Sequence, residues 1–105
     1  MGALAGLVGI QPATELTAGT KVVTTAGTAV ALAASVSSKF VWIGAPHADG
    51  AEKNDASMLI GDATNQVMIL ANDDYKGYVI AIDDPSKLFI DAKTSLDRVN
   101  YIIFN

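Results

Sequence analysis

The residue types that carry most enzyme chemistry are scarce in this chain. Cysteine is absent and His47 is the single histidine, which excludes thiolate catalysis, cysteine-ligated zinc and any site built from two histidines. His47 follows Pro46 at the start of a polar stretch, so we expect an exposed loop residue; a catalytic or pH-sensing role is the alternative. No nucleophile-elbow sequence surrounds the serines that we considered, Ser35, Ser37, Ser38 and Ser57. We therefore predict no enzymatic activity and no cofactor.

Acidic residues are the next candidates, because carboxylates bind calcium or act in pairs in glycoside hydrolysis. They occur as neighbours at 73–74 and 83–84, and as a cluster of Asp49, Glu52 and Asp55. Calcium takes six to eight oxygens, but the Asp-x-Asn-x-Asp-Gly spacing is missing, which favours solvated turns over a metal site. Adjacent residues at the end of a strand point to opposite sides, which disfavours a catalytic carboxylate pair. We predict no metal site.

Composition narrows the class of partner. The formal net charge is −4, and the six lysines and Arg98 are scattered, whereas binding to a nucleic-acid backbone needs clustered basic residues. No stretch approaches the ~20 consecutive apolar residues of a membrane span. Hydrophobic residues make up 50% and charged residues 17%, against about 25% charged in an average soluble domain. We therefore expect no nucleic-acid partner and no membrane, but a surface that other proteins can bury.

Any functional site must be positioned by the secondary-structure elements, which we expect to form from short apolar runs separated by turn residues. The runs lie at residues 21–25, 28–33, 39–44, 58–60, 67–70, 78–82, 88–90 and 99–104. This spacing predicts a single all-β domain, an antiparallel β-sandwich or jelly-roll-like barrel of about eight strands. A helix over residues 29–36 is the competing interpretation of the alanine-rich run. The run 39–44 is apolar on both faces, which predicts a central strand with Trp42 in the core.

The loops and aromatic residues leave one binding function open. Residues 46–57 combine glycine, asparagine and charged residues without periodicity, which predicts the longest and most exposed loop. Five aromatic side chains could line a sugar-binding face, although core or interface positions are the more usual role in a small sandwich: Tyr75, Tyr78, Phe89, Tyr101 and Phe104.

Residues 1–20 differ from the rest, and we interpret them as an extended N-terminal arm preceding a sandwich domain at residues 21–105. The arm is rich in glycine, alanine and threonine and is broken by Pro12. Ordering about 12 residues costs roughly 1–2 kcal/mol each in backbone entropy. Burying an aliphatic side chain returns only about 1.5–3 kcal/mol. Order therefore requires further contacts, and we predict that the arm lies against another chain through its apolar residues, Leu4, Leu7, Val8 and Ile10.

Several segments of residues 21–104 resemble the small all-β virion proteins of tailed bacteriophages, in particular capsid decoration (cement) proteins. The matching segments read VTTAGTAV at 23–30, LIGD at 59–62, IDDPSKLFIDA at 82–92 and VNY at 99–101. After Leu70 such proteins often carry a Pro-Gly-Glu-like turn, whereas this chain has ANDD at 71–74.

The resemblance implies a structural role without enzymatic activity or cofactor. It implies binding to the major capsid protein on the capsid exterior of the virion. It also implies self-association, commonly as a homotrimer at threefold positions, with the arm reaching across neighbouring capsomers. The alternative is a receptor- or glycan-binding domain of a tail fibre or spike, with Tyr75, Tyr78 and the long loop at its site.

Overall fold

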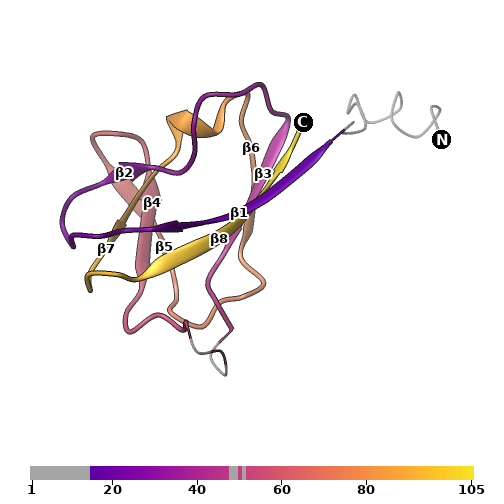
Figure 1. Cartoon of the computed structure of the whole chain (residues 1–105). Coiled ribbons are helices and arrows are strands. Elements are labelled where there is room, and N and C mark those ends of the chain that lie inside the picture. Colours follow the sequence, from indigo (N-terminus) through magenta and orange to yellow (C-terminus); the bar gives the residue numbers. More distant parts are fainter. Residues whose placement is uncertain (1–14, 48–49, 51) are drawn as a thin grey trace.

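The chain folds into two packed antiparallel sheets (Figure 1). The structure is a computed structural model that describes residues 15–47, 50 and 52–105. The described part contains eight strands and one short 3-10 helix: β1 (Leu16–Val22), β2 (Val30–Ala31), β3 (Phe40–Gly44), β4 (Met58–Gly61), β5 (Gln66–Leu70), β6 (Tyr78–Ala81), η1 (Pro85–Lys87), β7 (Phe89–Ala92) and β8 (Arg98–Phe104). The predicted all-β sandwich is confirmed, and the two sheets do not close into a barrel.

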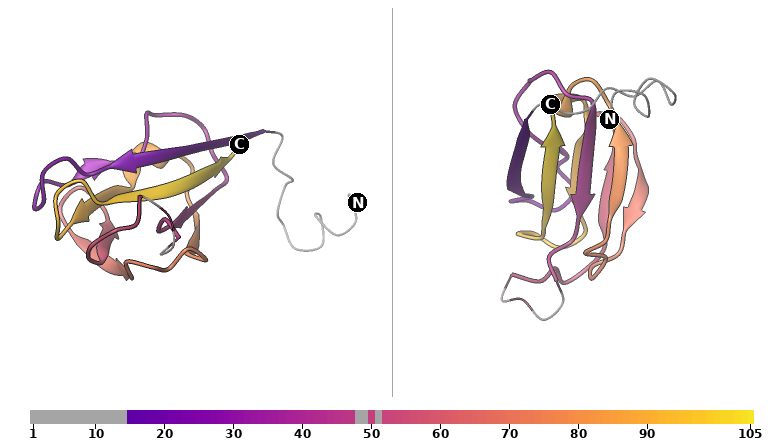
Figure 2. Two further views of the ribbon diagram at one scale, coloured as in Figure 1. Left: turned by 60° about the horizontal axis from the view of Figure 1, so that its bottom comes forward. Right: turned by 90° about the vertical axis from the view of Figure 1, so that its right-hand side faces the viewer.

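Each sheet has four strands. Sheet A has the order β1-β8-β3-β6, and its strands lie side by side in the right-hand view of Figure 2. Sheet B has the order β2-β7-β4-β5. The chain crosses repeatedly between the sheets, so neighbouring strands within a sheet are mostly far apart in sequence. The competing helix over residues 29–36 does not form, because β2 pairs with β7 there.

The core lies between the sheets and consists of aliphatic side chains that alternate along the strands. Val41 and Ile43 of β3 are fully buried, and Met58 and Ile60 of β4 face them from sheet B. Successive residues of a strand point to opposite faces. Phe40 and the other residues that alternate with these buried positions therefore point away from the core.

The first strand differs from its predicted position. We expected it over residues 21–25, but β1 begins at Leu16 and ends at Val22. Residues 16–20, which we assigned to the arm, therefore belong to sheet A and pair with β8 over their whole length. The cause is backbone pairing with the apolar run of β8, which does not require apolar side chains in the segment TAGT at 17–20.

A buried polar clamp attaches the end of the long loop to sheet A. The Asp97 carboxylate, 4% exposed, accepts hydrogen bonds from the backbone N–H groups of Asp55 at 2.9 Å and Ala56 at 3.0 Å. The Asn54 side chain donates to the Arg98 carbonyl at 2.7 Å and accepts from the Arg98 N–H at 2.8 Å. The predicted exposed loop is therefore fixed at its C-terminal end, because buried polar groups need such partners.

Positive φ occurs in three turns of the described structure, at Gly27, Gly77 and Leu96. Gly77 has φ of +66°, and a Cβ at this position would collide with the carbonyl of Ile43. Leu96 is the one described non-glycine residue with positive φ, at +76°, and its side chain is 59% exposed. The left-handed region is costly for a residue with a Cβ, so Leu96 holds a strained conformation in the turn before β8.

Candidate protein-interaction surfaces

The outward face of sheet A carries two rows of apolar side chains. The β1–β8, β8–β3 and β3–β6 registers place one row across all four strands as Leu16, Phe104, Phe40 and Ala81. The next row inward along the strands is Ala18, Ile102, Trp42 and Val79. We call these eight residues the A face.

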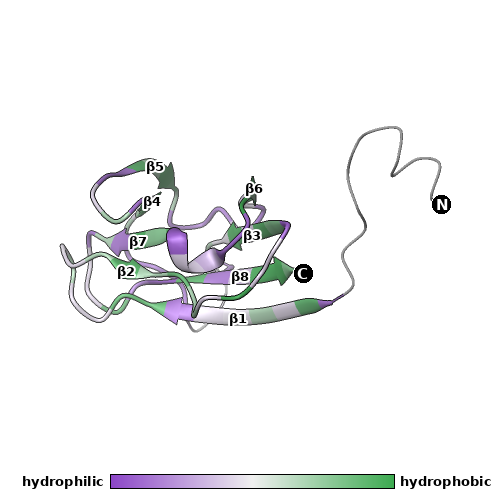
Figure 3. Cartoon of the chain, turned by 90° about the horizontal axis from the view of Figure 1, so that it is seen from above, coloured by the Kyte–Doolittle hydropathy of each residue, from purple (hydrophilic) through white to green (hydrophobic). Residues whose placement is uncertain are grey.

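The A face is accessible and uncharged. Leu16 and Val79 at its two edges are 67% and 66% exposed, and the large residues between them are half-buried. In Figure 3 the green of apolar residues runs along β3 and the C-terminal part of β8. Contiguous apolar surface of this kind marks interaction sites in soluble proteins.

Trp42 belongs to this face, which corrects our prediction that it lies in the core. The alternation along β3 buries Val41 and Ile43, so Trp42 between them must point outward. Its indole Nε1 donates to the Lys76 carbonyl at 2.7 Å. The ring lies over Gly44, where a Cβ would collide with it. The side chain is therefore held flat against the sheet, and its apolar surface is presented in a fixed orientation.

Polar groups border the A face on one side. The Thr20 hydroxyl donates to Asn100 Oδ1 at 2.8 Å, in the row after Ala18 and Ile102. Beyond them, Arg98 Nη1 lies 3.2 Å from Glu52 Oε2. Pairs of this kind are typical of the polar rim that surrounds an apolar interface core.

The outward face of sheet B is also apolar. Val67 and Ile69 of the edge strand β5 are 79% and 57% exposed, and Ile69 lies beside Leu59 of β4. Phe89 of β7 and Ala31 of β2 continue this surface. We call these five residues the B face. The two faces lie on opposite sides of the sandwich, because they belong to the outer surfaces of its two layers.

Few charged residues lie on the strands that form the two faces. Among the eight strands, charged side chains occur only at Lys21, Asp91 and Arg98. Asp91 points outward from sheet B but is only 9% exposed, and its Oδ1 accepts from the backbone N–H groups of Gly27 at 3.0 Å and Ala92 at 2.7 Å. The remaining described charges lie in loops, turns and η1.

The acidic turns have structural partners. Asp84 caps η1, and hydrogen bonds from the Ser35 hydroxyl, and then from Ser86, lower the pKa of its carboxyl to about 2. Asp62 accepts from the backbone N–H groups of Asn65 and Thr64, which lowers the pKa of that carboxyl too. Within the described residues, no group of three or more His, Asp or Glu side chains is arranged to hold a metal ion.

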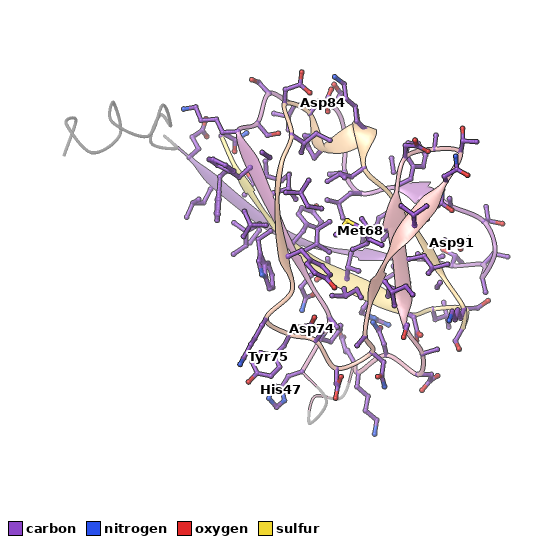
Figure 4. All side chains as sticks on the ribbon, turned by 180° about the vertical axis from the view of Figure 1, so that it is seen from behind. His47, Met68, Asp74, Tyr75, Asp84 and Asp91 are labelled. Carbon is purple, nitrogen blue, oxygen red and sulfur yellow. The ribbon has the colours of Figure 1, made fainter. Side chains whose placement is uncertain are left out.

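The aromatic residues that we considered for sugar binding do not share one surface. Tyr78 lies toward the inner side of sheet A, and its hydroxyl donates to the Ile69 carbonyl at 3.0 Å. Phe104 belongs to the A face and Phe89 to the B face. Tyr75 is 50% exposed, and its ring centroid lies 4.7 Å from that of His47, beside Asp74 (Figure 4). His47 is exposed, as predicted.

The remaining predicted contacts lie elsewhere. Leu4, Leu7, Val8 and Ile10 fall outside the described residues. No helix in the described ranges has the length and apolar character needed to cross a membrane. Comparisons of the chain with protein-family models, with curated proteins and with solved structures gave no match.

Sequence reasoning missed both faces, although a signal was present. The runs at 58–60, 67–70 and 99–104 are apolar at consecutive positions, which supplies side chains to both sides of a strand. A two-layer sandwich covers only one side of each strand, so continuous apolar runs in a chain of this size predict apolar outward faces.

Proposed function

We propose that this chain is a structural virion protein of the capsid decoration type, which binds the outside of a phage head and stabilises contacts between capsomers. The observation that carries the proposal is the pair of apolar faces on opposite sides of one small sandwich. A protein that joins neighbours needs at least two adhesive surfaces, whereas a monomeric binding module needs one. The resemblance of residues 21–104 to decoration proteins supports the same role.

The proposed stabilising role depends on the binding of many identical copies to one capsid. Each copy adds buried apolar area across a boundary between capsomers, where pressure from packaged DNA strains the shell. Individual contacts can be modest, because many copies on one lattice bind with a high effective concentration. We assign one apolar face to the major capsid protein, the other to a neighbouring copy, and residues 1–14 to further contact with the capsid. Grouping of three copies at threefold positions is the arrangement that the resemblance implies.

A sedimentation experiment with heads of the phage that encodes the chain tests this function. We expect the full chain to sediment with heads lacking it, and a variant without residues 1–12 to remain folded but to lose occupancy. The charge insertion Val67→Glu on the B face, compared with Ala63→Glu in the β4–β5 turn, tests the sandwich contribution. Unchanged occupancy of the truncated chain would contradict the assigned role of the arm. Failure of the full chain to bind heads would contradict the function itself.

The exposed Tyr75 ring beside His47 favours one second candidate, a receptor- or glycan-binding domain of a tail fibre or spike. An exposed aromatic ring offers a stacking surface for a sugar. A glycan array with the intact chain, with Tyr75→Ala as the matched variant, separates the two functions. Saturable glycan binding that Tyr75→Ala abolishes, together with absence of head binding, would favour the second candidate.

A further inference from the structure

We propose that the free edge of β6 binds an extended segment of the capsid protein as a fifth strand of sheet A. This inference rests on the proposed function, in which the capsid is the partner, and deepens it by naming the element that makes the contact. The contact is a row of backbone hydrogen bonds between β6 and the added strand, which is a general mode of peptide recognition.

The direction of the hydrogen bonds along β3 fixes which backbone groups of β6 are paired. Just beyond β3, the Ala45 N–H donates to the Asp74 carbonyl at 2.9 Å, on the side of the strand where β6 lies. Successive residues of a strand direct their backbone groups to alternate sides. Two and four residues earlier, Ile43 and Val41 therefore bond to β6 as well, whereas Trp42 between them bonds to β8.

Two residues of β6 are left with free backbone groups. Tyr78 and Ile80 are the partners of these two residues of β3, so their N–H and C=O groups point toward β3. The N–H and C=O groups of Val79 and Ala81 point the other way, where β6 is the last strand of sheet A. Both residues are exposed. Unpaired groups along an edge are a template for another strand.

The other three sheet edges carry features that hinder strand addition. β2 has only two residues, and the register of β5 shifts at a bulge opposite Gly61. β1 carries Lys21, which pairs with the buried Val99 and therefore points to the inner side of the sheet. Short length, bulges and inward-pointing charges all protect sheet edges in natural proteins. The segment YVIA at 78–81 has no charge, no proline and no bulge, which makes β6 the edge most open to another chain.

A strand added to β6 would also cover apolar side chains that the two layers leave half-buried. The Tyr78 hydroxyl donates to the Ile69 carbonyl of β5 at 3.0 Å, so the edge strands β6 and β5 lie on the same side of the sandwich. Ile80 of β6 and Met68 of β5, labelled in Figure 4, pack against the core there and remain half-buried. The added strand would therefore direct apolar side chains toward the core at alternate positions.

The charges around β6 select the occupant. Within six residues on either side of the strand, four carboxylates outnumber two lysines: Asp73, Asp74, Lys76, Asp83, Asp84 and Lys87. One lysine is already paired, since Lys87 Nζ lies 2.9 Å from Asp83 Oδ1. A segment with Lys or Arg at its ends complements this surface. Residues 1–14 of a second copy contain no charged side chain, and that copy carries a net charge of −4. The occupant is therefore a basic-ended segment of the capsid protein.

Hydrogen exchange of the full chain on heads tests this contact. The chain labelled with nitrogen-15 is bound to unlabelled heads that lack it, exposed to deuterated water, recovered and dissolved in dimethyl sulfoxide, where NMR measures each remaining amide proton. In the free chain the Val79 and Ala81 amides should exchange quickly, because they have no acceptor. On heads we expect their exchange to be slower by about tenfold or more, since the added strand supplies acceptors.

The matched amides are those of Ala18 and Thr20 on the free edge of β1. The hydrogen bond from the Asn105 N–H to the Glu15 carbonyl directs the odd-numbered residues of β1 toward β8, so these two residues face away. We expect their exchange to be the same on heads and in solution. Slowing at β1 without slowing at β6 would overturn the assigned edge. Slow exchange at β6 in a concentrated solution without heads would make the chain itself the occupant and overturn the assigned partner.

Two substitutions at Val79 separate hydrogen bonding from apolar contact. Val79→Pro removes the outward N–H and preserves the bonds between β6 and β3, because an edge strand tolerates proline where the N–H faces solvent. Val79→Ala keeps the donor and shortens the side chain. We expect affinity for heads to fall about tenfold for Val79→Pro and less than about threefold for Val79→Ala. Equal losses would show a contact without strand pairing and overturn the inference. Circular dichroism verifies folding, and if Val79→Pro does not fold, exchange in the unaltered chain decides.

Failure of the proposed function has a different signature from failure of this inference. A full chain that does not sediment with heads would contradict the capsid role and the strand addition together. A chain that sediments with heads while the Val79 and Ala81 amides exchange as fast as in solution would overturn the strand addition alone.

Discussion

Replacing Asp97 with alanine should strongly destabilise the sandwich. The carboxylate is 4% exposed and accepts two backbone hydrogen bonds, from Asp55 and Ala56, at 2.9 and 3.0 Å. Hydrogen bonds to charged groups contribute about 1.5–3 kcal/mol each. Their sum is about 3–6 kcal/mol, and relief from burying a carboxylate offsets part of it. We expect a loss of about 3 kcal/mol in the free energy of unfolding.

This loss is a large part of the total stability, because the free energy of unfolding of native domains is about 5–15 kcal/mol. Urea unfolding followed by far-UV circular dichroism, and by the fluorescence of Trp42 as the only tryptophan, measures it. Asp97→Asn keeps one acceptor oxygen and should lose about half as much. The matched control is Asp73→Ala, an exposed acidic residue in the turn before β6, and it should change stability by less than about 0.5 kcal/mol. A loss below about 1 kcal/mol for Asp97→Ala would refute the assignment of the clamp.

Further expectations concern an ionisable cap and three turns. Ser35→Ala removes the main hydrogen bond to Asp84, so the pKa of that carboxyl should rise from about 2 toward its ordinary 3.8, as carbon-detected NMR titration would report. Because the folded pKa lies below the unfolded one, the stabilising effect of Asp84 is present above pH ~4 and is lost as the pH falls toward 2; this acid dependence should weaken in Ser35→Ala, and an unchanged profile would contradict it. Gly77→Ala should lower the free energy of unfolding by more than about 2 kcal/mol, because positive φ and a backbone collision both oppose it. Gly27→Ala also has positive φ, but it meets no atom within 4 Å and should cost only about 1 kcal/mol; equal losses at the two glycines would contradict this reasoning. Leu96→Gly should stabilise the fold by up to about 1 kcal/mol in thermal unfolding, since it relieves the left-handed conformation at φ of +76°, and a lower Tm would show that Leu96 is not strained.

The fold class was predictable because strand spacing and turn residues are local signals. Eight apolar runs gave eight strands, and only β1 was displaced, since the segment around Gly19 is held by backbone pairing that its side chains do not announce. The location of Trp42 was not predictable from size and polarity alone. It depends on which side of β3 faces sheet B, and that is decided by the alternating Val41 and Ile43.

The presence of exposed apolar surface was predictable from the sequence, but its location was not. Low charge content indicated a surface that proteins can bury, yet the A face joins residues as distant in sequence as Leu16 and Phe104. Such a surface can be identified only when the order of the strands in the sheet is known. The clamp at Asn54 and Asp97 carried no signal either, because buried polar residues have the same sequence context as exposed loop residues.

Most of the charged residues lie in the loops, and this has a consequence for how ionic conditions would act on the proposed assembly. With apolar faces on two sides and net negative charge in the loops around them, added salt would screen repulsion between copies while leaving the attraction between faces intact. Proteins that bind nucleic acid respond in the opposite sense, because salt weakens their contacts. Acidification toward the isoelectric point of about 4.6 would act like salt. If copies associate as proposed, the charged loops would therefore set the threshold concentration for association, and the apolar strands would set the geometry of the contact.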